Sequence, residues 1–232
     1  MAQYTREEEA IDPCLLLSDE VQAWENKVKA LVEGFCRGTK EPQCCVYRLK
    51  EYASRLHSEL NTRQRYLNTL NNAHHFVPGS SRRWGWFELI DTPSLRVGLI
   101  SLYRFSPIPV HDHPNTFGIQ KIISGKVRVR QYQFPSNSKQ DHSLVSLEKV
   151  FNRILIKGES SYFTPSLRNL HELESVSSQS VVLSLMANPY RHHKRSWYYP
   201  VPMTATGVTS LYSRVRIKPL KPEAPNVIAR KC

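Results

Sequence analysis

The sequence predicts a mainly β protein, a sandwich or small barrel of antiparallel strands, with helices before it. Apolar residues recur at helical spacing in the first third of the chain. From about residue 83 onward the chain consists of short β-rich stretches separated by Pro, Gly, Ser and Asn, and no long helical pattern lies between them. We therefore expect an all-β body that follows an N-terminal helical segment.

The first helix is expected over residues 18–35. Ser-Asp-Glu at residues 18–20 provides an N-cap and an acidic first turn, and apolar residues follow at helical spacing. The segment GTKEP, residues 38–42, interrupts the pattern. Helical spacing resumes over residues 44–71, so the first third should contain about two helices.

Strands are expected where β-rich residues cluster between turn residues. The expected strands are WGWFELI (84–90), LRVGLISLYRF (95–105), FGIQKII (117–123), KVRVRQYQF (126–134), RILI (153–156) and VVLSLM (181–186). The fourth alternates cleanly, so Lys126, Arg128 and Arg130 should face solvent while Val127 and Val129 face the core.

The composition indicates a folded cytoplasmic protein. Of the 232 residues, 40% are hydrophobic, which is enough for a packed core. No apolar run reaches the ~18 residues of a membrane span, and the acidic start lacks a signal core, so no membrane partner is expected. The cysteine number is odd and the spacing matches no disulfide framework, which favours reduced thiols. The five are Cys14, Cys36, Cys44, Cys45 and Cys232.

The formal charge of +12 is unevenly distributed. Residues 1–30 are acidic, whereas residues 213–232 are basic and contain several prolines. Such a surplus attracts anions, but no nucleic-acid-binding motif accompanies it, so nucleic acid is not an expected partner. The expected organisation is a helical extension (1–75), a β-barrel (76–212) and a basic tail (213–232).

A pair of histidines in VHDHP, residues 110–114, indicates a metal site. Side chains at i and i+2 of a strand share a face, so His111 and His113 can reach one ion while Asp112 points away. His171 follows a proline turn and precedes a strand, and is the third candidate ligand. Three neutral imidazoles leave a divalent ion its full charge and open positions, which suits thiolate and O2 binding or zinc hydration chemistry. The residues alone do not choose between these reactions.

The spacing of these residues resembles the cupin family. In its first motif a His-x-His pair is followed after three or four residues by a glutamate, and then by a glycine. Gly125 stands in the glycine register, but the glutamate position falls at Phe117 or Gly118, neither of which binds metal. The second motif ends in a histidine after a proline turn, as His171 does. The chain therefore resembles a cupin that lacks its carboxylate ligand.

Two longer runs resemble the thiol dioxygenases, particularly the cysteamine dioxygenase and plant cysteine oxidase branch. They are HDHPNTFGIQKIISGKVRVRQY (111–132) and LHELESVSSQSVVLSLMANPYRHHKRSWYYPV (170–201). The resemblance implies a cupin (double-stranded β-helix, jelly-roll) barrel behind N-terminal helices. It also implies Fe(2+) on the three histidines, oxidation of a small thiol by O2 to the sulfinic acid, and a catalytic Tyr190 near the iron.

The chain also departs from this pattern. Ser184 stands where the branch usually has an acid near the metal, and one strand face offers only Val182, Ser184 and Met186. No cysteine falls in the expected barrel, so the tyrosine–cysteine cross-link of the cysteine dioxygenase branch cannot form.

A cysteine-like or mercapto-acid substrate needs a cation for its carboxylate, and Arg96, Arg104 and Arg168 are the substrate-binding candidates. Two alternatives remain. One is a non-catalytic cupin that binds a metal or a small anion in a sensing or regulatory role, and the other is a different metal-dependent cupin enzyme.

Overall fold

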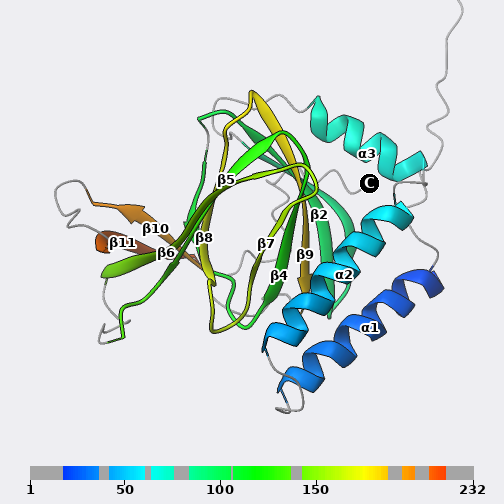
Figure 1. The fold of residues 1–232 in the computed structure, drawn as a ribbon, viewed down its shortest axis with the longest axis horizontal. Coiled ribbons are helices and arrows are strands. Elements are labelled where there is room, and N and C mark those ends of the chain that lie inside the picture. The colour runs from blue at the N-terminus through cyan, green and yellow to red at the C-terminus, as the bar shows by residue number, and fades with distance from the viewer. Residues whose placement is uncertain are drawn as a thin grey trace, which may run out of the picture.

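Three helices cover one side of a β-structure in the computed structural model of the chain (Figure 1). The structure describes residues 18–36, 42–60, 64–75, 84–105, 107–136, 143–187, 195–201 and 209–217. The helices are α1 (Ser18–Cys36), α2 (Pro42–Leu60) and α3 (Gln64–His74). The strands are β1 (Trp84–Asp91), β2 (Leu95–Tyr103), β3 (Ile108–His111), β4 (Phe117–Ser124), β5 (Lys126–Gln133), β6 (Leu144–Ile156), β7 (Ser160–Phe163), β8 (Leu170–Ser175), β9 (Gln179–Ala187), β10 (Arg195–Pro200) and β11 (Thr209–Ile217).

The helical layer packs through the apolar stripe that the sequence predicts. Trp24 and Val28 of α1 and Leu56 of α2 are buried in one cluster with sheet residues such as Val97 and Leu185. The Trp24 indole also donates a hydrogen bond to Glu59, at 2.8 Å, which ties α1 to α2. The second expected helix is in fact two, because α2 ends at residue 60 and α3 begins at residue 64.

Beneath the helices lies a five-stranded antiparallel sheet in the order β1-β2-β9-β4-β7. Alternation along β2 sends Val97 and Leu99 toward the helices, while Ile100 joins the core on the opposite face. That opposite face lines the interior of the β-structure. The sheet therefore separates a dry helix-facing layer from the interior that contains the histidines.

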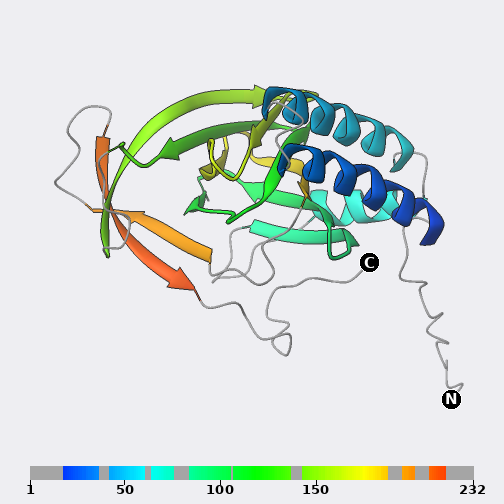
Figure 2. The ribbon, with the colours of Figure 1, turned by 90° about the horizontal axis from the view of Figure 1, so that it is seen from below.

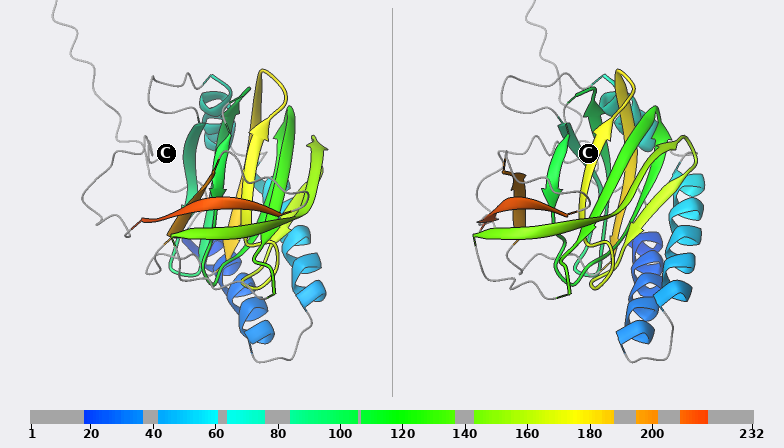
Figure 3. Two further views of the ribbon diagram at one scale, coloured as in Figure 1. Left: turned by 90° about the vertical axis from the view of Figure 1, so that its left-hand side faces the viewer. Right: turned by 60° about the vertical axis from the view of Figure 1, so that its left-hand side comes forward.

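The other six strands close into a ring in the order β10-β11-β6-β5-β8-β3. Val127 and Val129 of β5 are fully buried, and Arg128 and Arg130 face outward as predicted, where they pair with Glu174 and Glu172 of β8. Strands β10 and β11 lie at the end of the molecule away from the helices (Figure 2). Figure 3 shows β11 alongside β6, with which it pairs.

The predicted fold class is confirmed: the described chain is mostly β, it closes into a barrel, and the helices come first. RILI is only the end of the 13-residue strand β6. Strand β11 crosses the boundary expected at residue 212, and residues 218–232 of the expected tail lie outside the described residues. None of the described helices is both long enough and apolar enough to cross a membrane.

Candidate metal centre

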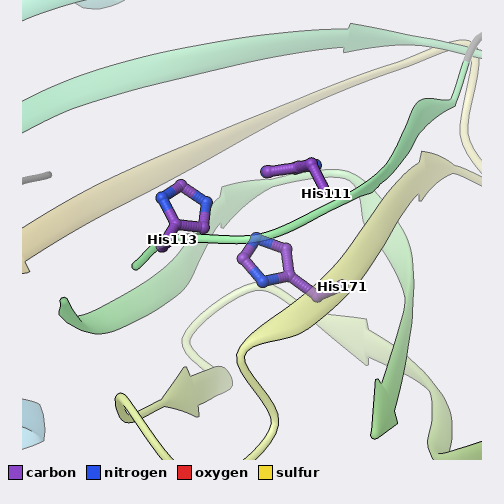
Figure 4. A group of neighbouring side chains, drawn as sticks. All are labelled: His111, His113 and His171. Carbon is purple, nitrogen blue, oxygen red and sulfur yellow. The ribbon is translucent and has the colours of Figure 1, made fainter. Parts of the chain in front are cut away.

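Three histidine rings converge inside the barrel (Figure 4). His111 ends β3 and lies opposite His171 of β8 in the antiparallel register, and His113 follows in the loop after β3. One ring nitrogen from each residue lies within 4.8 Å of the others, and all three residues are buried. The three expected ligands therefore meet in one place, and their nitrogen atoms are close enough together to bind one ion.

The histidines are neutral in the folded protein. Burial lowers the pKa of His111 and of His113 well below 6.5, and lowers the pKa of His171 to about 3. The positive charge of Arg195 lowers all three further. Neutral imidazoles keep a lone pair for a metal ion, so the donor set fits a divalent transition metal.

Hydrogen bonds fix which nitrogen of two rings carries the lone pair. The Nδ1 of His111 lies 2.8 Å from the carbonyl oxygen of Pro109, which can only accept, so Nδ1 carries the proton and Nε2 is free for an ion. The Nε2 of His171 lies 2.9 Å from the side-chain nitrogen of Gln120. Because that nitrogen can only donate, Nε2 of His171 is the acceptor and carries the lone pair. The hydroxyl of Ser161 in turn donates to the other end of that amide, at 3.0 Å.

Asn169 and Asp112 hold the loop that carries the histidines. The amide of Asn169 accepts from the backbone nitrogen of His113 and donates to its carbonyl oxygen, both at 2.8 Å. Asp112 points away from the ring cluster, as the strand alternation predicts, and accepts hydrogen bonds from Ser196 and Tyr198 of β10. These contacts fix His113 relative to His171 and to β10.

A phenyl ring fills the space above Gly118, one of the two positions where the cupin resemblance expects a glutamate. A Cβ atom on Gly118 would overlap the ring of Phe163 on the neighbouring strand β7. That ring stacks on His113 and on His171, with centroid distances of 4.7 Å and 4.8 Å. The glycine is therefore required by the aromatic ring beside the metal centre.

The five-stranded sheet β1-β2-β9-β4-β7 turns one face toward the histidines, and the strand register aligns the residues of that face in rows. The outer row contains Arg96, Met186 and Gly118 on β2, β9 and β4. The next row inward contains Gly98, Ser184, Gln120 and Ser161. The buried hydroxyl of Ser184 therefore lies on the strand beside Gln120, in the row that reaches His171.

The sequence profile of the PCO_ADO family matches residues 46–218. The chain belongs to the PCO_ADO family. The matched region includes most of α2, all of α3 and every described strand, and therefore the whole histidine cluster.

Relatives and solved structures are more distant. The chain is 24% identical over 126 residues to 2-aminoethanethiol dioxygenase of Homo sapiens, and 24% identical over 124 residues to that of Mus musculus. These matches cover 45% of this chain and 47% and 48% of the relatives, so the chain spans about half the length of the curated relatives it matches. A double-stranded β-helix protein of Klebsiella pneumoniae is 15% identical, with a TM-score of 0.38 over 51% of this chain and 88% of that one.

In this PCO_ADO member the candidate substrate arginines lie in three different places. Arg96 is in the outer row, contacts Glu88 at 3.4 Å, stacks on Trp86, and its charge acts on His113. Arg104 is exposed and lies beyond the far end of β2, stacked on Phe105. The structure thus brings Arg96 toward the histidines and leaves Arg104 apart from them.

Arg168 lies in a cleft beside the barrel. Its guanidinium stacks on Phe151 and Tyr162, which line this cleft of about 520 Å³. Ser161 lines the same cleft, so the cleft borders the residue that holds Gln120. The expected catalytic residue, Tyr190, lies outside the described residues.

The sequence alone did not indicate several residues that surround the three histidines of this PCO_ADO family member. These residues are Gln120, Ser161, Asn169, Arg195 and Trp197. Gln120 is a buried polar residue in the mostly apolar strand FGIQKIIS, and alternation from Gly118 places it inside. Trp197 pairs with His111 in register, and its ring lies 5.0 Å from that imidazole. These pairings between distant strands leave no signal at short range in the sequence.

The metal-free protein should lose stability as the pH falls below neutral. An unfolded histidine has a pKa near 6.5, whereas the folded histidines stay neutral to much lower pH, so the unfolded chain binds more protons below about pH 6.5. The stability is complete above that pH and is lost as the pH falls toward about 3, where His171 titrates. Between pH 7.5 and 5.5 the free energy of unfolding should fall by roughly 1 kcal/mol for each histidine.

Urea unfolding of the metal-free protein measures this dependence. His171→Leu should reduce the slope of stability against pH by about one proton. A flat profile between pH 7.5 and 5.5 would contradict the prediction.

Proposed function

We propose that the chain is a non-haem iron(II) thiol dioxygenase that converts a small thiol, R–SH, to the sulfinic acid R–SO2H with O2. The observation that carries this proposal is the buried cluster of three neutral histidines, which no carboxylate joins within the described part of the chain. Both oxygen atoms of O2 enter the product, and the sulfur is oxidised by four electrons. Membership in the PCO_ADO family supports the same reaction.

Iron is the proposed metal because the reaction transfers electrons to O2 and zinc has no redox chemistry. His111, His113 and His171 would hold it. Three neutral imidazoles would leave the charge of iron(II) uncompensated, which would favour binding of an anionic thiolate.

The chain itself supplies a dry and electropositive environment. Phe163 stacks on His113, the ring of Trp197 lies tilted against His111, and both rings exclude water from their sides of the centre. Arg195 stacks on Trp197 at 4.3 Å, and its charge acts on all three histidines. A positive field of this kind favours the ionised form of a thiol.

The proposed substrate is a cysteine-like thiol or a mercapto-acid. Arg96 is the proposed partner of the substrate carboxylate, and the Oε1 of its neighbour Glu88 is buried without a hydrogen-bond partner. A buried carboxylate oxygen of this kind needs a donor, and the ammonium group of an amino thiol can provide one. The curated relatives are named for an aminothiol substrate, so both kinds of compound belong in the test.

The test is O2 consumption by iron-loaded protein with cysteine, 3-mercaptopropionate, cysteamine and a peptide that begins with cysteine. Turnover of the carboxylate-bearing thiols should exceed that of cysteamine. Faster turnover of cysteamine or the peptide would overturn the substrate preference and keep the dioxygenase. No consumption with any of the four would favour a non-catalytic metal- or anion-binding role.

Arg96→Met should raise the apparent KM for the preferred carboxylate-bearing thiol by about 10-fold, which equals about 1.4 kcal/mol. The expected loss is moderate because Arg96 is partly exposed and already contacts Glu88. Arg104→Met is the matched control, since this exposed arginine lies beyond the far end of the same strand. Equal effects of the two substitutions would contradict the assignment of Arg96.

Tyr190 is the proposed catalytic residue from the family resemblance. Tyr190→Phe removes only the hydroxyl, so a fall in kcat at unchanged metal content would support a role in the reaction. Unchanged kcat would remove Tyr190 from the site.

A further inference from the structure

We propose that Gln120 is the fourth polar group of the metal centre, and that its amide N–H donates a hydrogen bond to an anionic ligand bound on the metal. The proposal rests on the metal site of the proposed function, but it does not depend on the reaction. It assigns to this chain a neutral donor in the region where a typical cupin places a carboxylate ligand.

The first step is the position of Gln120 on β4. The strand presents Gly118, Gln120 and Ile122 to the interior, because side chains two residues apart share a face. The ring of Phe163 occupies the space over Gly118, so no side chain can reach the histidines from there. Gln120 is the next residue on that face, and its side-chain nitrogen does reach His171, at 2.9 Å.

The second step is the orientation of the amide. The hydroxyl of Ser161 lies 3.0 Å from Oε1 of Gln120 and donates to it, while the NH2 end of the amide faces His171. Gln120 is 2% exposed and Ser161 is 3% exposed, so water does not compete for either group. The hydrogen bond from the buried Ser161 hydroxyl therefore holds the Gln120 amide in position.

The third step is what happens to this donor when the histidines hold an ion. An ion held through Nε2 of His171 would take the lone pair that now accepts from Gln120, so the amide N–H would need another acceptor. A buried N–H without an acceptor is unfavourable. An anionic ligand on the ion, next to His171, supplies a new acceptor, and hydrogen bonds to a charged partner are the stronger kind. Gln120 thereby favours anionic ligands, such as a thiolate, over neutral ones.

The experiment measures azide binding to Co(2+)-substituted protein by visible absorption, with imidazole as the neutral ligand. Gln120→Leu should weaken azide binding by about 10-fold or more, shift the absorption bands of the azide complex, and leave imidazole affinity within about 2-fold. Ser161→Ala, which frees the amide, should weaken azide binding by a smaller factor. The matched control is Ser184→Ala, because Ser184 lies beside Gln120 in the same row of the sheet.

Gln120→Glu tests the same position with a charged group. A carboxylate in this place should bind the ion itself, raise metal affinity and abolish azide binding, since it occupies the position of the anion. Azide affinity that stays within 2-fold in Gln120→Leu, with one cobalt ion per chain, would overturn the proposal and leave Gln120 as a packing residue. Azide binding is measured without thiol or O2, so failure of the dioxygenase reaction would not produce this outcome. If Gln120→Leu did not fold, an unchanged azide affinity in both Ser161→Ala and Gln120→Asn would overturn it equally.

Discussion

Replacing His111, His113 or His171 by alanine, one at a time, is expected to strip bound divalent metal from the protein and abolish thiol oxidation. Two imidazoles make a poor site for a divalent ion. Loss of a partner outside the ligand set commonly weakens a metal site by 10–100-fold, so loss of a ligand should weaken it by more than about 100-fold. Metal content after dialysis, measured by elemental analysis, tests this directly.

Two further variants make the comparison specific. His75→Ala removes an exposed histidine after α3 and should retain one metal ion per chain. Asn169→Ala keeps all three ligands but removes both hydrogen bonds to the backbone of His113, so its metal affinity should fall by an intermediate factor of roughly 10–100. Stoichiometric metal in the variant with all three histidines replaced would show that the ligand assignment is wrong.

The fold class and the histidines could be predicted because their signals are local. Strand alternation in β5 correctly predicts which of its residues face outward, and the i, i+2 spacing of His111 and His113 correctly places both on one side of Asp112. The helical pattern over residues 44–71 was also correct in type. The expected number of helices in this stretch was wrong, because the apolar spacing continues across the boundary between α2 and α3.

The residues around the histidines could not be predicted because they are brought in by pairing between distant strands. Asn169 reaches His113 across 56 residues, and Gln120 reaches His171 across 51. The same applies to Phe163, whose ring explains why position 118 is glycine. The sequence has no acid at positions 117 and 118, whereas only the packing of β7 against β4 shows that an aromatic ring fills the space above Gly118.

Restoring the cupin carboxylate by Gly118→Glu is expected to destabilise the protein by about 3 kcal/mol or more, and not to create a fourth ligand. Overpacking of a filled core alone costs about 1–3 kcal/mol, and an unpaired buried carboxylate adds to that cost. Gly118→Ala should show the steric part alone, at about 1–3 kcal/mol, because its Cβ already overlaps the Phe163 ring. Urea unfolding of the metal-free variants measures both values.

Removing the ring should reverse the effect of the glutamate. Phe163→Ala alone should cost about 3–5 kcal/mol, since it leaves a cavity beside His113 and His171. In the double variant the glutamate side chain enters that cavity, so the two losses should not add, and the coupling should be about 1–3 kcal/mol in favour of the double variant. The double variant should also bind Co(2+) more tightly than Phe163→Ala, because the new carboxylate faces the three histidines. Additive losses and unchanged metal affinity would show that the Phe163 ring is not what keeps a carboxylate out of this centre.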